Sequence, residues 1–197
     1  MFTKKFVVPL ARSFSASTRT LARRAVRPQH AINTVRTFSC NVPRLDRIAD
    51  AEQQIKQGTE YLNQGSIDMA MNSYHKSVQL APSAAGYFNI GVCYFQMGKH
   101  RDAIEAFEKS LEFQPNQADA HTNIASAHLM LKNVNEAVRH LEQASNFNPL
   151  DGEIQYNLGC VYEATGNLDG ARTRFERAEM LGISKAKEAL EKLAKKL

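Results

Sequence analysis

The chain lacks the residue sets on which most catalytic and metal sites depend. It contains no glycine-rich phosphate loop, no His-Glu-x-x-His motif and no nucleophile elbow. Its three cysteines, Cys40, Cys93 and Cys160, are scattered and have no metal-type spacing, so a disulfide framework is not expected either. We therefore predict a protein that is not an enzyme and that needs no cofactor.

Long apolar runs are missing as well. None approaches the roughly 20 residues needed to span a bilayer, so integral membrane contact is not expected. Acidic residues are absent from residues 1–38, which hold eight of the 25 Lys and Arg residues. The remainder keeps 17 basic residues against all 20 acidic ones, a net charge of −3. Since the excess of basic charge lies within residues 1–38, a nucleic-acid partner is not predicted for the rest of the chain.

Residues 1–38 are rich in Arg, Ser and Thr, and Phe6, Leu10 and Phe14 recur every four residues, as in a short basic amphipathic helix. The stretch resembles a mitochondrial presequence. Arg36-Thr37-Phe38-Ser39 is similar to sites cut by the matrix processing peptidase, so we expect cleavage between Phe38 and Ser39 and a matrix location. A plastid transit peptide and an uncleaved basic tail are the alternatives.

Residues 84–115 predict a helical hairpin. Tyr87, Ile90, Gly91 and Tyr94 form one helical stripe, and Ala103, Ile104, Phe107 and Leu111 form a second. Gly98-Lys99 interrupts the pattern, and Pro115 ends it. The hairpin recurs, because Pro82, Pro115 and Pro149 are 33 and 34 residues apart. Aligning on these prolines superposes a small position, a bulky position and a turn: Gly58, Gly91, Ala125 and Gly159; Tyr74, Phe107, Leu141 and Phe175; Gly65, Gly98, Asn133 (one residue late) and Gly166.

The pattern Tyr87-x2-Ile90-Gly91-x2-Tyr94…Ala103-x3-Phe107…Pro115 resembles the tetratricopeptide repeat. Residues 51–183 hold four copies, at 51–83, 84–117, 118–151 and 152–183. The resemblance implies an all-α fold, a right-handed α-solenoid of four hairpins. We expect a linker at 39–50, with a start of the first helix already at Leu45-Asp46-Arg47-Ile48 as the alternative. We also expect a capping helix at 184–197, with Ser184 as its N-cap and five lysines on its outer face.

His121 and His128 lie seven residues apart on one helical face, which suggests metal ligands as one interpretation. They occupy positions where the other repeats carry aromatic residues or Gln, so we interpret them as packing residues and predict no metal site. His75, His100 and His140 each stand alone in the sequence.

The resemblance also implies a partner-binding groove, because the first helix of each such hairpin lines the concave side. Asn89, Asn123 and Asn157 recur there, and they resemble the asparagine ladder with which O-linked N-acetylglucosamine transferases hold peptide backbone. Together with the neighbouring apolar side chains they give the predicted partner-binding residues: Ile55, Phe88, Asn89, Val92, Phe95, Asn123, Leu129, Tyr156 and Asn157. Asp119, Glu153 and Glu163 make the far end of the groove acidic.

We therefore expect a non-catalytic adaptor or assembly factor of the mitochondrial matrix that holds an extended segment of a partner protein. Two alternatives remain open. The protein is a structural subunit of a larger mitochondrial complex, or it sits peripherally on the inner membrane through the basic helix at 184–197.

Overall fold

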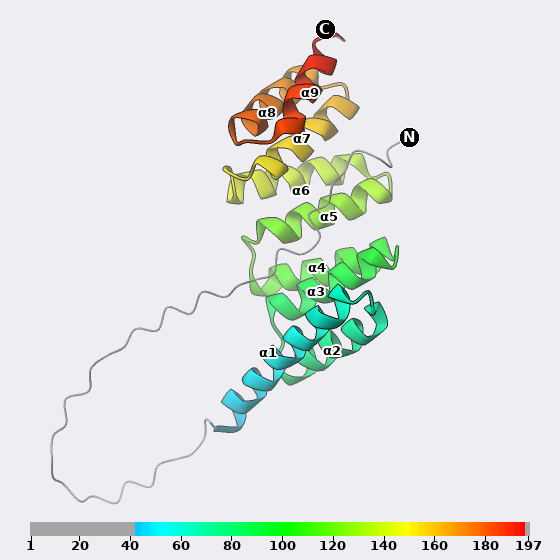
Figure 1. The fold of residues 1–197 in the computed structure, drawn as a ribbon, viewed down its shortest axis with the longest axis vertical. Coiled ribbons are helices and arrows are strands. Elements are labelled where there is room, and N and C mark those ends of the chain that lie inside the picture. Colours follow the sequence, from blue (N-terminus) through cyan, green and yellow to red (C-terminus); the bar gives the residue numbers. More distant parts are fainter. Residues whose placement is uncertain (1–41, 196–197) are drawn as a thin grey trace, which may run out of the picture.

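The computed structural model describes residues 42–195, and all regular structure in that range is α-helical (Figure 1). Eight of its helices form four hairpins, which stack in chain order, and a ninth closes the array. The helices are α1 (Val42–Asn63), α2 (Ile67–Leu80), α3 (Ala84–Gln96), α4 (His100–Phe113), α5 (Ala118–Met130), α6 (Val134–Phe147), α7 (Gly152–Ala164), α8 (Leu168–Met180) and α9 (Ser184–Leu193). The predicted all-α solenoid is confirmed.

Each hairpin reverses direction at a residue in the left-handed backbone region. Three hairpins use glycine, for which this conformation is free of steric strain: Gly65 (φ 77°), Gly98 (φ 73°) and Gly166 (φ 83°). In the third hairpin Lys132 takes this role with a φ of 64°. The structure thus corrects the predicted turn position from Asn133 to the residue before it. The N–H of Asn133 instead donates to the carbonyl of His128 at 2.8 Å, which closes the turn.

The repeated small and bulky positions meet between the two helices of a hairpin, a pairing that the sequence alignment did not predict. A Cβ atom on Gly159 would lie 2.7 Å from the ring of Phe175, which is fully buried. In the third hairpin Ala125 and Leu141 belong to one buried cluster. Ala125 is larger than Gly159, and its partner Leu141 is smaller than Phe175. The two pairs therefore fill a similar space between the helices.

The predicted linker at 39–50 is wrong for its described part, because α1 already begins at Val42. Pro43 lies in the first helical turn, where its missing N–H has no helical partner to lose. The first turns of α1 project beyond α2 (Figure 1). As a result Leu45 is 61% exposed and Ile48 is 39% exposed, an apolar end of the array that the sequence did not indicate.

The C-terminal helix α9 caps the array as expected. Ala186 and Leu193 are buried, and they join a core cluster with Phe175 of α8. The predicted N-cap is corrected, since Ile183 occupies the N-cap position and Ser184 is the first helical residue. The apolar face of α9 therefore completes the fold.

None of the described helices has the length and hydropathy needed to cross a membrane. The predicted presequence, with its cleavage between Phe38 and Ser39, lies outside the described residues.

Candidate functional site

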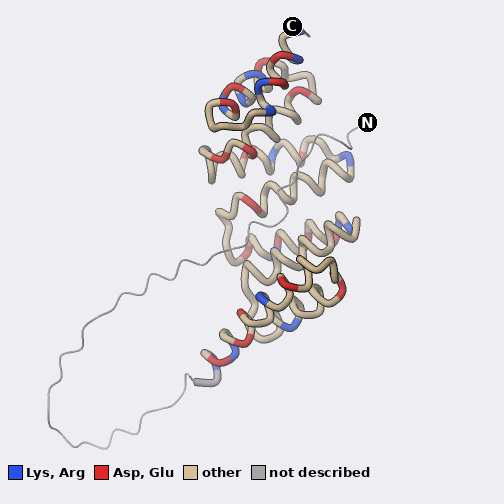
Figure 2. Tube along the Cα trace, viewed as in Figure 1, with Lys and Arg blue, Asp and Glu red and all other residues tan. Residues whose placement is uncertain are grey.

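Charge is distributed unevenly between the two helices of each hairpin (Figure 2). Helix α3 carries no charged residue, α5 carries only Asp119, and α7 carries only Glu153 and Glu163. Helices α4 and α8 carry six Asp, Glu, Lys or Arg residues each. The first helices of hairpins two to four therefore present neutral side chains, while the second helices carry most of the charge.

Three of the predicted partner-binding residues are buried in the core. Phe88 is 7% exposed, Val92 is 4% exposed and Tyr156 is 8% exposed. The ring centroids of Phe88 and Phe107 are 5.4 Å apart, and the cluster that holds both also contains Ile124 of the next hairpin. The prediction that these apolar side chains line an open groove is therefore wrong. They pack instead against the second helix of their own hairpin and against the next hairpin or α9.

The predicted asparagine ladder is not continuous. Asn89 is half-buried, but Asn123 is only 9% exposed and Asn157 only 2% exposed. The side-chain oxygen of Asn157 is buried and has no hydrogen-bond partner. Asn89 is therefore the most exposed residue of this row.

Four half-buried side chains at the N-terminal end of the array stay within reach of a partner. Ile55 and Leu62 extend from α1, and Asn89 and Phe95 extend from α3. Their apolar members pack on core clusters to which α3 also contributes. We call these four residues the α1–α3 face. Leu129, another predicted binding residue, is half-buried in a separate cluster of the third and fourth hairpins.

One residue of the predicted acidic end of the groove, Glu153, is paired with a lysine of α9. The Nζ atom of Lys185 lies 2.6 Å from a carboxylate oxygen of Glu153 and 4.4 Å from the ring centroid of Tyr156. This lysine thus places a positive charge at the position where the sequence indicated an uncompensated acid.

The third hairpin brings three histidines together. Nδ1 of His121 and Nδ1 of His140 are 3.1 Å apart, and the rings of His128 and His140 stack with centroids 5.8 Å apart. The expectation that His140 stands alone is therefore wrong. The ring of His121 also packs on Phe147, in agreement with its predicted packing role. Its contact with His140 was not predicted.

Burial sets the protonation of this cluster. Burial first, and the positive charge of Arg139 second, lower the pKa of His140 to about 4. Burial also lowers the pKa of His121 and of His128, although the carboxylates of Glu136 and Glu108 partly offset the shift at His128. His140 is therefore neutral at pH 7, as a metal-binding imidazole must be.

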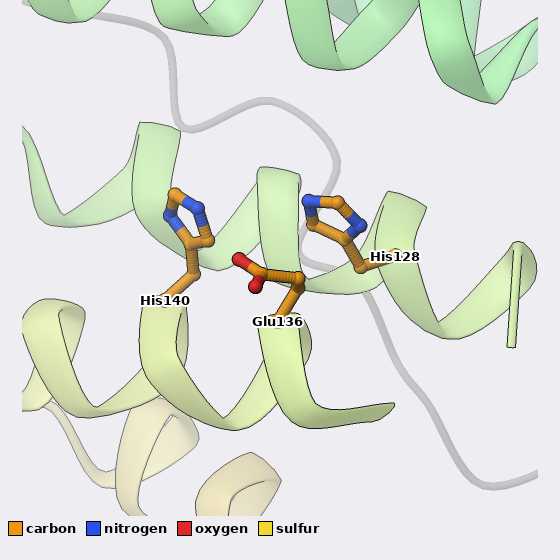
Figure 3. Close-up of side chains that lie close together, drawn as sticks. All are labelled: His128, Glu136 and His140. Carbon is orange, nitrogen blue, oxygen red and sulfur yellow. The ribbon is translucent and has the colours of Figure 1, made fainter. Parts of the chain in front are cut away.

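One acidic residue completes a group of three side chains whose types can act as metal ligands. One ligand atom from each of His128, Glu136 and His140 lies within 4.8 Å of the other two. Figure 3 shows the carboxylate of Glu136 between the two imidazole rings. The sequence did not indicate this set, because its members come from two helices, α5 and α6. The available signal was the concentration of three histidines in a single repeat.

Comparison with known proteins agrees with the repeat pattern. Family models described as tetratricopeptide repeat match residues 84–117 and 122–186, which together make up half of the chain. The "DnaJ homolog subfamily C member 7 homolog" of Dictyostelium discoideum is 24% identical over 119 residues, covering 58% of this chain and 22% of that protein. This chain spans less than a quarter of the length of the curated relatives it matches first.

Solved structures show the same architecture. The crystal structure of MamA aligns with a TM-score of 0.63 and 25% identity, over 73% of this chain and 85% of that one. The first TPR of Spaghetti (RPAP3) bound to an HSP90 peptide aligns with a TM-score of 0.58 and 21% identity, over 60% and 95% of the two chains. The latter likeness shows a shared fold.

Proposed function

This chain belongs to the tetratricopeptide repeat family, and we propose that it is a non-catalytic adaptor that binds an extended segment of a partner protein. We further propose that it works in the mitochondrial matrix. The observation that carries the proposal is the neutral surface of α3, which has no charged residue yet leaves Asn89 and Phe95 partly accessible. A half-buried aromatic ring and a half-buried amide on one uncharged helix are suited to an apolar side chain and the backbone of a bound peptide.

The same face argues for a neutral or apolar segment over an acidic one. Its side chains are Ile55, Leu62, Asn89 and Phe95, none of which is cationic. The HSP90 peptide in the RPAP3 structure, SRMEEVD, is acidic at its end. We therefore infer a partner chemistry that differs from that of the solved neighbour.

The arginine-rich leader with its resemblance to a presequence supports a matrix location. Peripheral attachment to the inner membrane through the C-terminal helix has less support, because α9 buries Ala186 and Leu193 against the core. Its apolar face is used in the fold and is not available to a bilayer.

The binding proposal is tested by pull-down from mitochondria with the full-length protein. The variant Asn89→Ala/Phe95→Ala removes the accessible amide and ring, and we expect at least tenfold weaker capture, since burying one Phe contributes about 1.5–3 kcal/mol. The matched control, Leu150→Ala/Met180→Ala, changes residues that are 71% and 86% exposed and lie outside the α1–α3 face. Circular dichroism checks that both variants keep the helicity of the wild type.

A photo-crosslinking amino acid at Gln96, which is exposed beside Phe95, then identifies the bound segment by mass spectrometry. A neutral, partly apolar partner segment supports the proposal. Equal capture by wild type and by Asn89→Ala/Phe95→Ala would show that this face is not the binding surface. The location is checked separately, by import into isolated mitochondria and sequencing of the mature N-terminus.

A further inference from the structure

The other three repeats show that this fold does not require histidine at the positions of the cluster. The position of His128 holds tyrosine in all three: Tyr61, Tyr94 and Tyr162. The position of His140 holds Ser73, Ala106 and Arg174. Packing alone therefore does not account for the imidazoles, and their mutual contacts in the third hairpin need another explanation.

The hydrogen bonds fix the tautomer of each connected ring. Nε2 of His121 lies 3.3 Å from the carbonyl of Pro115, which can only accept, so Nε2 carries the proton and Nδ1 is an acceptor. Nδ1 of His140, 3.1 Å from that acceptor, must be the donor. A neutral His140 therefore has an unprotonated Nε2, the form in which imidazole binds a metal.

The fourth hairpin supports this assignment with residues whose roles are unambiguous. Nε2 of Gln155 donates to the carbonyl of Pro149 at 3.3 Å, and its Oε1 accepts from Arg174 at 3.0 Å. Gln155 and Arg174 occupy the positions of His121 and His140. The same donor direction thus runs through both hairpins, from the second helix to the first and on to the proline carbonyl.

The guanidinium group of Arg139 contacts two of the potential ligands. Nη2 of Arg139 lies 2.7 Å from Oε2 of Glu136 and 3.0 Å from Nε2 of His140. A guanidinium only donates, which again makes Nε2 of His140 the acceptor. The side chain of Arg139 is 56% exposed and that of Glu136 is 48% exposed, so both can move without disturbing the core.

We propose that His128, Glu136 and His140 bind one divalent transition-metal ion, with Zn²⁺ as the best fit to two imidazoles and a carboxylate. Bonds of about 2.0–2.2 Å in a tetrahedron bring ligand atoms to about 3.4 Å from one another. The present separations of up to 4.8 Å close when Glu136 turns inward and Arg139 leaves.

In this arrangement His121 acts as a positioning residue, because its Nδ1 holds the proton of His140 away from the metal. The ion joins α5 to α6 beside the turn at Lys132, and water or a side chain of a bound protein completes the tetrahedron. This site is independent of the α1–α3 face, which lies on the first two hairpins.

The test is calorimetric titration of Zn²⁺ into the full-length protein after removal of metals with a chelator. We expect one saturable site. His128→Tyr and His140→Arg each weaken binding at least 100-fold, and both introduce residues that other repeats hold at the same position. His75→Gln, which changes a histidine outside the cluster, leaves binding unchanged. The ligand-field absorption of Co²⁺ at the same site gives a second readout.

The positioning role of His121 has its own pair of variants. His121→Gln keeps the donor and acceptor that Gln155 supplies in the fourth hairpin, so binding is retained. His121→Leu removes both, and binding weakens 10- to 100-fold. Absence of saturable Zn²⁺ binding, or binding that is equal in wild type, His128→Tyr and His140→Arg, would overturn the proposal.

Discussion

The third and fourth hairpins share a backbone and a hydrogen-bond pattern, yet they carry different chemistry. Both use a side chain on the first helix to connect a proline carbonyl to a donor on the second helix. The fourth hairpin uses Gln155 and Arg174, of which the arginine is permanently charged. The third uses His121 and His140, which are neutral and can titrate. The comparison teaches that the scaffold specifies donor and acceptor directions, while the residue type remains free to serve a site.

The two hairpins also solve the same packing problem in opposite ways. The fourth combines Gly159 with Phe175, and the third combines Ala125 with Leu141. The third hairpin has an additional methyl group on its first helix and a smaller side chain on its second, so the total side-chain volume of the pair is similar. Three experiments test whether these differences between the hairpins come from the side chains named here. They change the pH, the Gly159/Phe175 pair and the turn residue Lys132.

Acid is expected to produce the largest effect, through His140. In metal-free buffer an unfolded histidine takes up a proton near pH 6.5, whereas the pKa of His140 in the folded chain is about 4. The unfolded state therefore binds more protons between these values, and the free energy of unfolding falls by on the order of 3 kcal/mol as pH falls from 6.5 to 4. This stability is fully present above pH 6.5. Urea unfolding at a series of pH values measures it.

The variant His121→Gln/His140→Arg copies the fourth hairpin into the third and serves as the control. It lacks the buried neutral imidazole of position 140, so most of this pH-dependent loss should disappear. An identical pH profile in wild type and variant would mean that the loss of stability comes from other groups.

An intermediate effect is expected from Gly159→Ala. The new methyl group would lie 2.7 Å from the ring of Phe175, and such overpacking costs about 1–3 kcal/mol. Adding Phe175→Leu recreates the Ala/Leu pair of the third hairpin and should recover most of the loss. Thermal denaturation of the single and double variants measures both steps. A double variant that is no more stable than Gly159→Ala would show that the two hairpins differ in more than this pair.

The smallest effect concerns the turn. Lys132 adopts a left-handed conformation that is strained by about 1–2 kcal/mol for a residue with a side chain, whereas the other hairpins use glycine. Lys132→Gly should therefore stabilise the protein by roughly 0.5–1 kcal/mol, because the greater freedom of glycine in the unfolded chain offsets part of the gain. Lys132→Ala, which removes the charge but keeps the strain, is the control. Equal stability of the Gly and Ala variants in urea unfolding would contradict this account.

The helices and their pairing were predictable because the information is local. The spacing of Pro82, Pro115 and Pro149 gave the repeat, and the stripes around Tyr87 and Phe107 gave the two helices of a hairpin. The start of α1 was missed, since Pro43 is equally compatible with a linker and with a first helical turn.

The binding face was predicted less well. Phe88 and Tyr156 lie on the expected side of their helices, but the next hairpin or α9 covers them. Whether such a side chain reaches solvent depends on the angle at which hairpins stack, and no spacing within one helix encodes that angle. The contact between His121 and His140 was missed for a related reason, because it depends on the alignment of two helices across a turn.

The sequence by itself determined an all-α array of tetratricopeptide hairpins, because helical periodicity and turn residues act over a few neighbouring positions. Tertiary structure alone decided which predicted face stays open, and it assembled His128, Glu136 and His140 into one cluster. Both outcomes follow from packing between helices. That packing buries side chains and orients donors toward acceptors, and it thereby sets the exposure, the tautomer and the pKa of groups whose residue types the sequence merely lists.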